Sequence, residues 1–355
     1  MEKIYSNLKM FAFEKTLKGL VNKEVVPPVH IRIKPTNICN HDCWYCSYHV
    51  SGLELGNEMI YRDSIPIDKM HEIADDIVDM GVSAVTFSGG GEPLLYKRLP
   101  EIIKKFSEGG VKVASLTNGS NLKGKMADAF AKYASWIRIS LDGYDDESYA
   151  KARGVSKEEF GKLMNNLKEF SNRDTKCMLS TVYIIDKNNY NNIFDICKKL
   201  KDNGVKSVKL SGVIIGDSTF ENSSYHLSIK DKVHDQIILS KKLEDDNFSI
   251  NDSYHDLDER MWNKDYKTCP NLLYSPVIGA DCKVYTCHDK AYTDAGLIGD
   301  LNKISFKKFW MSSENAKQVY NFSPATSCKH HCVAHARNLL MHDFLSLNQN
   351  HIEFT

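Results

Sequence analysis

The sequence lacks any excess of charge of one sign. Its 355 residues include 46 Lys and Arg against 46 Asp and Glu, so the formal net charge is +0. Domains that bind nucleic acids usually carry a basic patch or stripe. The balanced composition therefore gives no indication of a nucleic acid or another polyanion as a partner.

Long hydrophobic runs are also missing. No apolar run approaches the roughly 18 residues that a membrane helix needs, and residues 1–6, MEKIYS, contain no apolar core of a signal peptide. The chain holds 42% hydrophobic and 26% charged residues, which is typical of a globular protein. We see no internal repeat or low-complexity segment, and we expect a cytoplasmic protein without a membrane partner.

Cysteine, in contrast, is plentiful, with ten residues in the chain. Cytoplasmic thiols stay reduced, which argues against a disulfide framework. Cys177 and Cys197 stand apart in apolar stretches and are expected in the core. The other eight form two groups, which favours metal or iron–sulfur binding. These groups are Cys39, Cys43 and Cys46 near the start, and Cys269, Cys282, Cys287, Cys328 and Cys332 near the end.

Residues 29–215 alternate short β-branched runs with longer amphipathic stretches. Two of the helical patterns end before Gly81 and Gly204, which are natural C-cap residues. Six such repeats call for parallel strands joined by right-handed crossovers, although periodicity alone does not distinguish an open sheet from a barrel. The predicted strands are 29–34, 84–88, 111–116, 136–141, 176–184 and 205–211.

The first cysteine group has the spacing C-x3-C-x2-C and follows the first predicted strand directly. Three thiolates can bind three irons of a [4Fe–4S] cube, whereas an electron-transfer ferredoxin uses four cysteines for each cube. The fourth iron is then open to a second molecule, like the open position of a catalytic metal. A structural zinc site and three unrelated thiols are the alternative interpretations.

Further candidate ligands follow the next predicted strands, at the edge where parallel α/β folds bind ligands. The run from Ser88 to Pro93, SGGGEP, removes three Cβ atoms and would let the backbone approach a ligand closely. Asn118 lies in the turn after strand three. Ser140 and Asp142 are two residues apart, so they point the same way in an extended strand and suit ribose hydroxyls. Ordinary turns are the structural alternative at each of these places.

Together these motifs resemble the radical S-adenosylmethionine (radical SAM) enzymes, whose cluster loop has this spacing and an aromatic residue, here Tyr45, before the last cysteine. The resemblance implies an α/β fold with a partial (β/α)6 barrel. It implies that the Gly-Gly-Glu-Pro segment binds the amino group of SAM and that Arg153 holds its carboxylate through a bidentate fork. Residues 211–214 would flank the adenine. The SAM-binding residues implied are Tyr45, Ser88, Gly90, Gly91, Glu92, Pro93, Asn118, Ser140, Asp142 and Arg153.

The C-terminal cysteines resemble the auxiliary-cluster extensions of these enzymes, called SPASM when complete and twitch when reduced. The complete form has about seven cysteines for two clusters, and five are present here. The resemblance implies one auxiliary [4Fe–4S] cluster on Cys269, Cys287, Cys328 and Cys332. Cys282 stands where the family usually has glycine. The first interpretation of this residue is a spare thiol, and the other interpretations are an alternative cluster ligand and a hydrogen donor. A four-ligand zinc site also matches the spacing. The nearby His288, His330, His331 and His335 are treated as ordinary polar residues.

The resemblance implies reductive cleavage of SAM to methionine and a 5′-deoxyadenosyl radical, which takes hydrogen from a substrate carbon. Flavodoxin or ferredoxin would donate the electron, and the enzyme would be oxygen-sensitive. The first interpretation of the activity is oxidation or epimerisation of a small molecule such as a sugar or aminocyclitol, by an oxidoreductase or an isomerase. Peptide modification comes second, because 28 residues before strand one are few for a leader-peptide domain. An iron–sulfur electron carrier or a zinc-stabilised binding module is the remoter alternative.

The length allows one large domain and a smaller one. We expect an N-terminal helix at 1–28, the barrel at 29–225, a helix and linker at 226–265, the SPASM/twitch-like domain at 266–340 and a C-terminal tail at 341–355.

Overall fold

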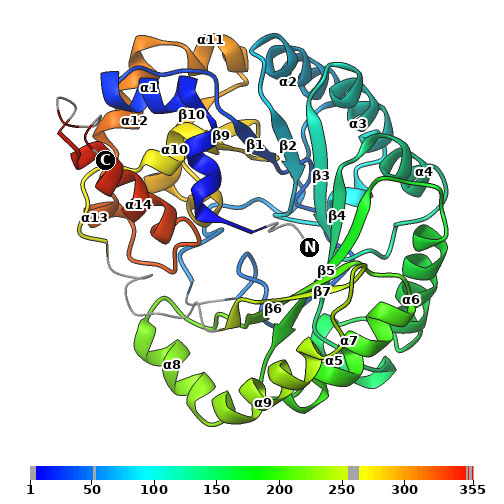
Figure 1. The fold of residues 1–355 in the computed structure, drawn as a ribbon. Coiled ribbons are helices and arrows are strands. Elements are labelled where there is room, and N and C mark those ends of the chain that lie inside the picture. Colours follow the sequence, from blue (N-terminus) through cyan, green and yellow to red (C-terminus); the bar gives the residue numbers. More distant parts are fainter. Residues whose placement is uncertain (1–4, 51–52, 255–263, 349–350, 352–353, 355) are drawn as a thin grey trace.

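The computed structural model describes residues 5–50, 53–254, 264–348, 351 and 354. In this part of the chain, ten strands form one curved sheet, with helices packed along its outer face (Figure 1). The order across the sheet is β10-β9-β8-β1-β2-β3-β4-β5-β6-β7. The strands are β1 (His30–Ile33), β2 (Ala84–Phe87), β3 (Lys112–Thr117), β4 (Trp136–Leu141), β5 (Met178–Ile185), β6 (Ser207–Gly212), β7 (Ser249–Asp252), β8 (Val277–Ile278), β9 (Lys283–Tyr285) and β10 (Leu297–Asp300).

The helices that cover the sheet are amphipathic. Ile73 and Ile77 of α2 and Ile102 and Phe106 of α3 are fully buried, and each such side chain contributes about 1.5–3 kcal/mol by leaving water. The helices are α1 (Glu14–Asn22), α2 (Ile67–Asp79), α3 (Leu99–Glu108), α4 (Gly124–Tyr133), α5 (Asp146–Arg153), α6 (Glu158–Ser171), α7 (Ile193–Asp202), α8 (Thr219–Leu227), α9 (Lys230–Lys241), α10 (Pro270–Tyr274), α11 (Phe306–Trp310), α12 (Ser313–Asn321), α13 (Pro324–Ser327) and α14 (His335–Ser346). In the ranges described, none of the helices has the length and apolar character to cross a membrane.

The six predicted strands are confirmed as β1 to β6, all parallel and in sequence order. A seventh parallel strand, β7, pairs with β6 through the register Lys209 to Asn251. The sequence analysis missed β7, which lies in the segment expected to be a helix and linker. Its four residues, Ser-Ile-Asn-Asp, include one buried side chain, Ile250, so they show no pattern of alternating hydrophobicity.

The C-terminal strands continue the same sheet. β8 pairs in parallel with β1, with Ile33 opposite Ile278, and β9 and β10 follow as antiparallel neighbours. The expected N-terminal helix is two shorter elements, a 3-10 helix at Asn7–Ala12 and α1, which meet at Phe13. The segment expected as a C-terminal tail begins inside α14.

Strand β1 separates an apolar face from a polar one. Ile31 and Ile33 are fully buried in the core. Because successive side chains of a strand alternate, His30, Arg32 and Lys34 point to the other, concave face of the sheet. The inside of the partial barrel is therefore polar along this strand.

His30 gives the fold a pH dependence. Its Nε2 lies 2.8 Å from Thr86 Oγ1 and its Nδ1 lies 3.0 Å from Ser275 Oγ, and burial lowers its pKa to about 3. Between pH 6.5 and 3 the unfolded chain binds a proton that folded His30 does not, so stability falls as pH falls. We expect His30 to contribute a loss of about 1–2 kcal/mol between pH 7 and pH 5. Urea unfolding at both pH values should show a smaller loss for His30→Gln; an equal loss would contradict this assignment.

Candidate functional site

The three N-terminal cysteines lie in one loop after β1, and this loop rests on the C-terminal end of α5. Asp42 N donates to Arg153 O at 2.8 Å, and Trp44 N donates to Ala152 O at 3.3 Å. Burial raises the pKa of the Cys43 thiol to about 12, and Cys46 and Cys39 add to this shift. The three thiols therefore lie close enough to affect one another's pKa values. A coordinating metal ionises such thiols outright, and their chemistry fits an iron–sulfur cluster.

Arg153 occupies a buried ion pair beside this loop. Its Nε lies 2.9 Å from the Asp142 carboxylate, and its Nη2 donates to Ser140 Oγ at 3.1 Å. The guanidinium also lies 6.0 Å from the centre of the Tyr45 ring. The structure thus brings four predicted SAM-binding residues together. It also shows a contact that the sequence analysis did not foresee, because the Asp142 side chain binds Arg153.

The glycine-rich loop after β2 packs against the cluster loop. A Cβ atom at Gly90 would lie 2.1 Å from Asn37 Oδ1, and one at Gly91 would lie 2.2 Å from Ile38 O. Gly91 N donates to Thr36 O at 3.1 Å. The missing Cβ atoms of Gly90 and Gly91 thus make room for residues 36–38, a packing requirement that was not foreseen from the sequence. The close approach of these glycines to a ligand stays a prediction.

Glu92 fastens the ends of β2 and β3 together. Its buried carboxylate accepts from Leu94 N at 2.9 Å, from Thr117 Oγ1 at 2.5 Å and from Asn118 N at 2.7 Å. The Asn118 side chain in turn donates to Asn40 Oδ1 in the cluster loop at 2.9 Å. The buried Pro93 begins the 3-10 turn after Glu92. These residues therefore hold the shape of the rim.

Some buried polar groups at this rim have no hydrogen-bond partner within the described part of the chain. The Ser88 hydroxyl and both ring nitrogens of His41 have no hydrogen-bond partner among the residues that the structure describes. Buried polar atoms normally have a hydrogen-bond partner, so each of these unpaired atoms is a place where a polar ligand fits. With the three thiols and the Arg153 guanidinium, they make a donor set suited to a cluster and the amino-acid part of SAM.

Four C-terminal cysteines gather from three segments. Cys269 precedes α10, Cys287 follows β9, and Cys328 and Cys332 flank the turn before α14. Burial raises the pKa of Cys287 far above its usual value, and Cys332, Cys269 and Cys328 add to that shift. Within the described ranges, no three His, Cys, Asp or Glu side chains are arranged to hold a single metal ion. A cubane places each thiolate on its own iron and so allows a wider spacing.

Cys282 lies apart from those four. It occupies the turn between β8 and β9 with φ of +60°, a left-handed conformation that favours glycine. Burial raises its pKa to about 11; Asp281 and Asp300 add to this rise and Lys69 opposes it, and no other cysteine contributes. Among the described residues it has no contact that supports a role as ligand or hydrogen donor, and the spare thiol stays the prediction.

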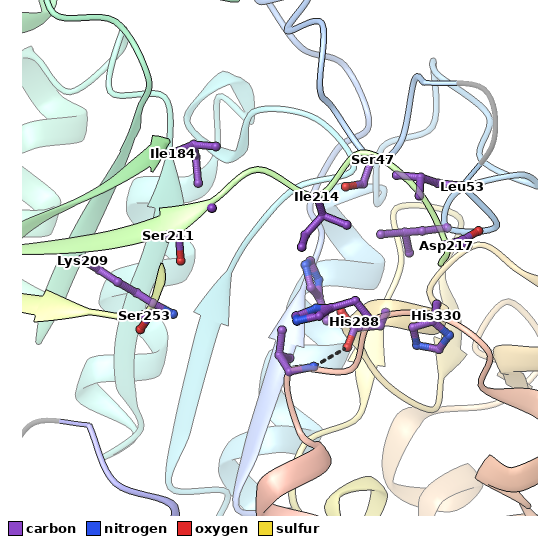
Figure 2. A pocket seen from close by; sticks show the side chains of 15 residues that line it. Ser47, Leu53, Ile184, Lys209, Ser211, Ile214, Asp217, Ser253, His288 and His330 are labelled. Atoms are coloured by element: carbon purple, nitrogen blue, oxygen red, sulfur yellow. Dashed lines mark hydrogen bonds between the residues drawn. The ribbon is translucent and has the colours of Figure 1, made fainter. Parts of the chain in front are cut away.

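A cavity of about 340 Å³ is lined by residues that neighbour both cysteine groups in the sequence, among them Ser47 and His288 (Figure 2). Ser47 of the cluster loop lines one side and His288 and His330 line another, while Ser211 and Ile214 come from the end of β6. The sequence analysis expected Ser211 and Ile214 beside adenine but did not single out Ser47 or Lys209. Lys209 and Ser211 are two residues apart on β6, and that spacing could have shown their shared face. A second cavity, of about 620 Å³, adjoins Asp142.

Comparison with known proteins shows which protein family residues 33–188 resemble. Residues 33–188 match the family model described as the Radical SAM superfamily. Solved structures with a similar fold include Streptococcus suis SuiB bound to S-adenosylmethionine, with a TM-score of 0.60 and 15% identity over 90% of this chain and 74% of that one. Another is native anSMEcpe with bound AdoMet, with a TM-score of 0.59 and 13% identity over 90% of this chain and 96% of that one. The chain therefore contains a radical SAM domain, as the motifs predicted.

Curated relatives are similar over part of their length. The S-adenosylmethionine-dependent nucleotide dehydratase of Lacinutrix mariniflava is 35% identical over 117 residues, which is 32% of this chain and 23% of that protein. The probable GTP 3′,8-cyclase of Sulfolobus acidocaldarius is 29% identical over 184 residues, 51% of this chain and 54% of that protein. This chain thus spans about a quarter to about half of these two relatives.

Proposed function

We propose that this protein is a radical SAM enzyme that removes a hydrogen atom from a substrate bound in the cavity of Figure 2. We propose that it also holds one auxiliary [4Fe–4S] cluster. The observation that carries the proposal is the position of this cavity. Ser47, one residue after Cys46, lines one side, and His288, one residue after Cys287, lines the other. A substrate there would contact residues that adjoin both cysteine groups.

The residues divide the work as follows. Cys39, Cys43 and Cys46 would hold the first cluster, and Arg153, fixed by Asp142 and Ser140, would bind the carboxylate of SAM. When bound, the reduced cluster and SAM supply one-electron cleavage of the sulfonium bond and a hydrogen-abstracting radical. Cys269, Cys287, Cys328 and Cys332 would hold the auxiliary cluster, with flavodoxin or ferredoxin as the external electron donor.

The cavity favours a small molecule as substrate. Its volume of about 340 Å³ lies at the lower end of the range for small-molecule sites. Leu53, Ile184 and Ile214 give it apolar walls, and Ser211 and Ser253 give it hydroxyl groups. The names of both curated relatives refer to nucleotides. We therefore propose oxidation or epimerisation of a hydroxylated small molecule, such as a sugar, an aminocyclitol or a nucleotide.

Peptide modification is the second candidate. One similar structure is SuiB bound to the precursor peptide SuiA, and its likeness covers 96% of this chain. Beside Asp217, which lines the cavity, helix α8 exposes Phe220 and Leu227, at 81% and 77% of their surface. An extended apolar segment of a peptide could pack on these side chains.

The test begins with anaerobic reconstitution, followed by counts of iron and sulfide and by SAM cleavage with dithionite. About eight irons for each chain and formation of 5′-deoxyadenosine are expected. Deuterated probes (GTP, CTP, glucose, 2-deoxystreptamine and serine- or cysteine-containing peptides) then show which compound transfers deuterium to 5′-deoxyadenosine. Transfer from a peptide alone would select the second candidate. Zinc in place of iron, or no cleavage by loaded protein, would select a binding module or an electron carrier.

A further inference from the structure

Lys34 is a lysine buried completely at the C-terminal end of β1. Its ammonium group donates to Gly89 O in the glycine-rich loop and to Tyr48 Oη, two residues after Cys46. The nitrogen also lies 4.2 Å from the centre of the Tyr48 ring and 5.5 Å from that of Tyr292. Two hydrogen bonds and two aromatic faces thus fix its position.

The same contacts lead from Lys34 to the C-terminal cysteines. Tyr48 Oη lies 3.4 Å from His288 Nδ1, and His288 is the residue after Cys287. The backbone N of Lys34 donates to Ile278 O of β8 at 2.8 Å. Lys34 is therefore attached to both halves of the site.

Lys34 lacks the counter-ion that a buried lysine normally has. Lys290, which is equally buried, lies 2.5 Å from the Glu54 carboxylate. Among the described residues, no Asp or Glu forms an ion pair with Lys34. A buried charge without an anionic partner is costly, so such groups are paired in stable proteins.

The groups that favour the charged form of Lys34 include one cysteine from each of the two cysteine groups. Burial lowers the pKa of Lys34 well below its usual value, and Arg32 adds to that shift. Asp289, Cys46 and Cys287 oppose it. A cubane held by three or four thiolates is itself an anion, and charge near a cluster is one of the factors that set its potential.

We propose that Lys34 is a shared counter-cation of the two iron–sulfur sites, positioned by Gly89 and Tyr48, which raises the reduction potential of both clusters. This inference rests on the proposed function, because it requires both clusters. A positive charge stabilises the reduced, more negative state of a cluster more than the oxidised state. Lys34 is here a positioning and electrostatic residue, and it takes no part in hydrogen abstraction.

Potentiometric titration followed by electron paramagnetic resonance tests the inference on reconstituted Lys34→Gln, Lys34→Arg and Tyr48→Phe. We expect Lys34→Gln to move both midpoint potentials to more negative values, while Lys34→Arg, which keeps the charge, stays near the wild type. Tyr48→Phe removes one of the two hydrogen bonds that position the charge but keeps the charge itself, so its potentials should shift less than those of Lys34→Gln. Unchanged potentials in fully loaded Lys34→Gln, or equal shifts in the Gln and Arg variants, would overturn the proposal.

Cluster loading covers the case in which a variant does not assemble. Iron lost in Lys34→Gln and retained in Lys34→Arg supports a need for the charge, whereas iron lost in both shows a requirement for lysine's shape and overturns the proposal. Wild-type protein that binds no iron would contradict the proposed function itself. Loaded, active wild type with unaltered potentials in Lys34→Gln would contradict only the role of Lys34.

Discussion

Replacing Cys39, Cys43 or Cys46 by alanine will abolish the formation of 5′-deoxyadenosine from SAM. Each variant leaves two of the three thiols in the loop that packs against α5. A cubane with an open iron needs the three thiolates that the spacing provides, so the SAM-binding cluster is lost or mis-assembled. Iron should fall from about eight to about four for each chain, because the C-terminal cysteines are untouched.

The matched control is Cys177→Ala, which removes a buried thiol outside both groups. This variant should keep its iron and its cleavage activity. Product is measured by anaerobic assay with dithionite and chromatography. Cleavage at wild-type rates by any of the three loop variants would show that another residue holds that iron.

Arg153→Met will both destabilise the fold and remove SAM binding. The substitution removes the Arg153 nitrogen that lies 2.9 Å from the Asp142 carboxylate. That carboxylate then stays buried without its partner. Breaking a buried pair in this way costs about 3–5 kcal/mol. Thermal unfolding should show the loss of stability, and calorimetric titration of reconstituted protein with SAM should show the loss of binding.

Two further variants separate stability from binding. Asp142→Asn combined with Arg153→Met removes both charges of the buried ion pair, so part of the stability should return while SAM binding stays absent. Lys157→Met removes the exposed pair with Glu147 and should leave both stability and binding unchanged. SAM binding retained by Arg153→Met would mean that another group holds the carboxylate.

The parallel strands were predictable because each one carries its own local signal. β4 was placed at Trp136–Leu141, as the structure has it. The predicted partners Ser140, Asp142 and Arg153 meet because strand alternation and one helix bring them together within thirteen residues. The sequence also marked Cys282 as the place where the family usually has glycine, and the structure gives this residue a φ of +60°.

The contacts between the two cysteine groups could not be predicted in this way. Tyr292 donates to Asn37 Oδ1 at 2.6 Å across 255 positions of sequence, and Tyr48 meets His288 across 240. No spacing rule links residues so far apart. The packing of Gly90 and Gly91 against residues 36–38 was missed for the same reason, because that loop lies about fifty residues earlier.

The parallel pairing of β8 with β1 has a consequence for any attempt to divide the protein. Removing the C-terminal segment would take away β8, one of the two strands that pair with β1, and leave β1 as an edge strand with the backbone N–H groups of Arg32 and Lys34 unpaired. Such an edge is a template for another chain, so the shortened protein would tend to aggregate. In the described part of the chain the outer strands are β10 and β7, each four residues long. The C-terminal segment thus also covers the edge of β1 that a shortened chain would expose.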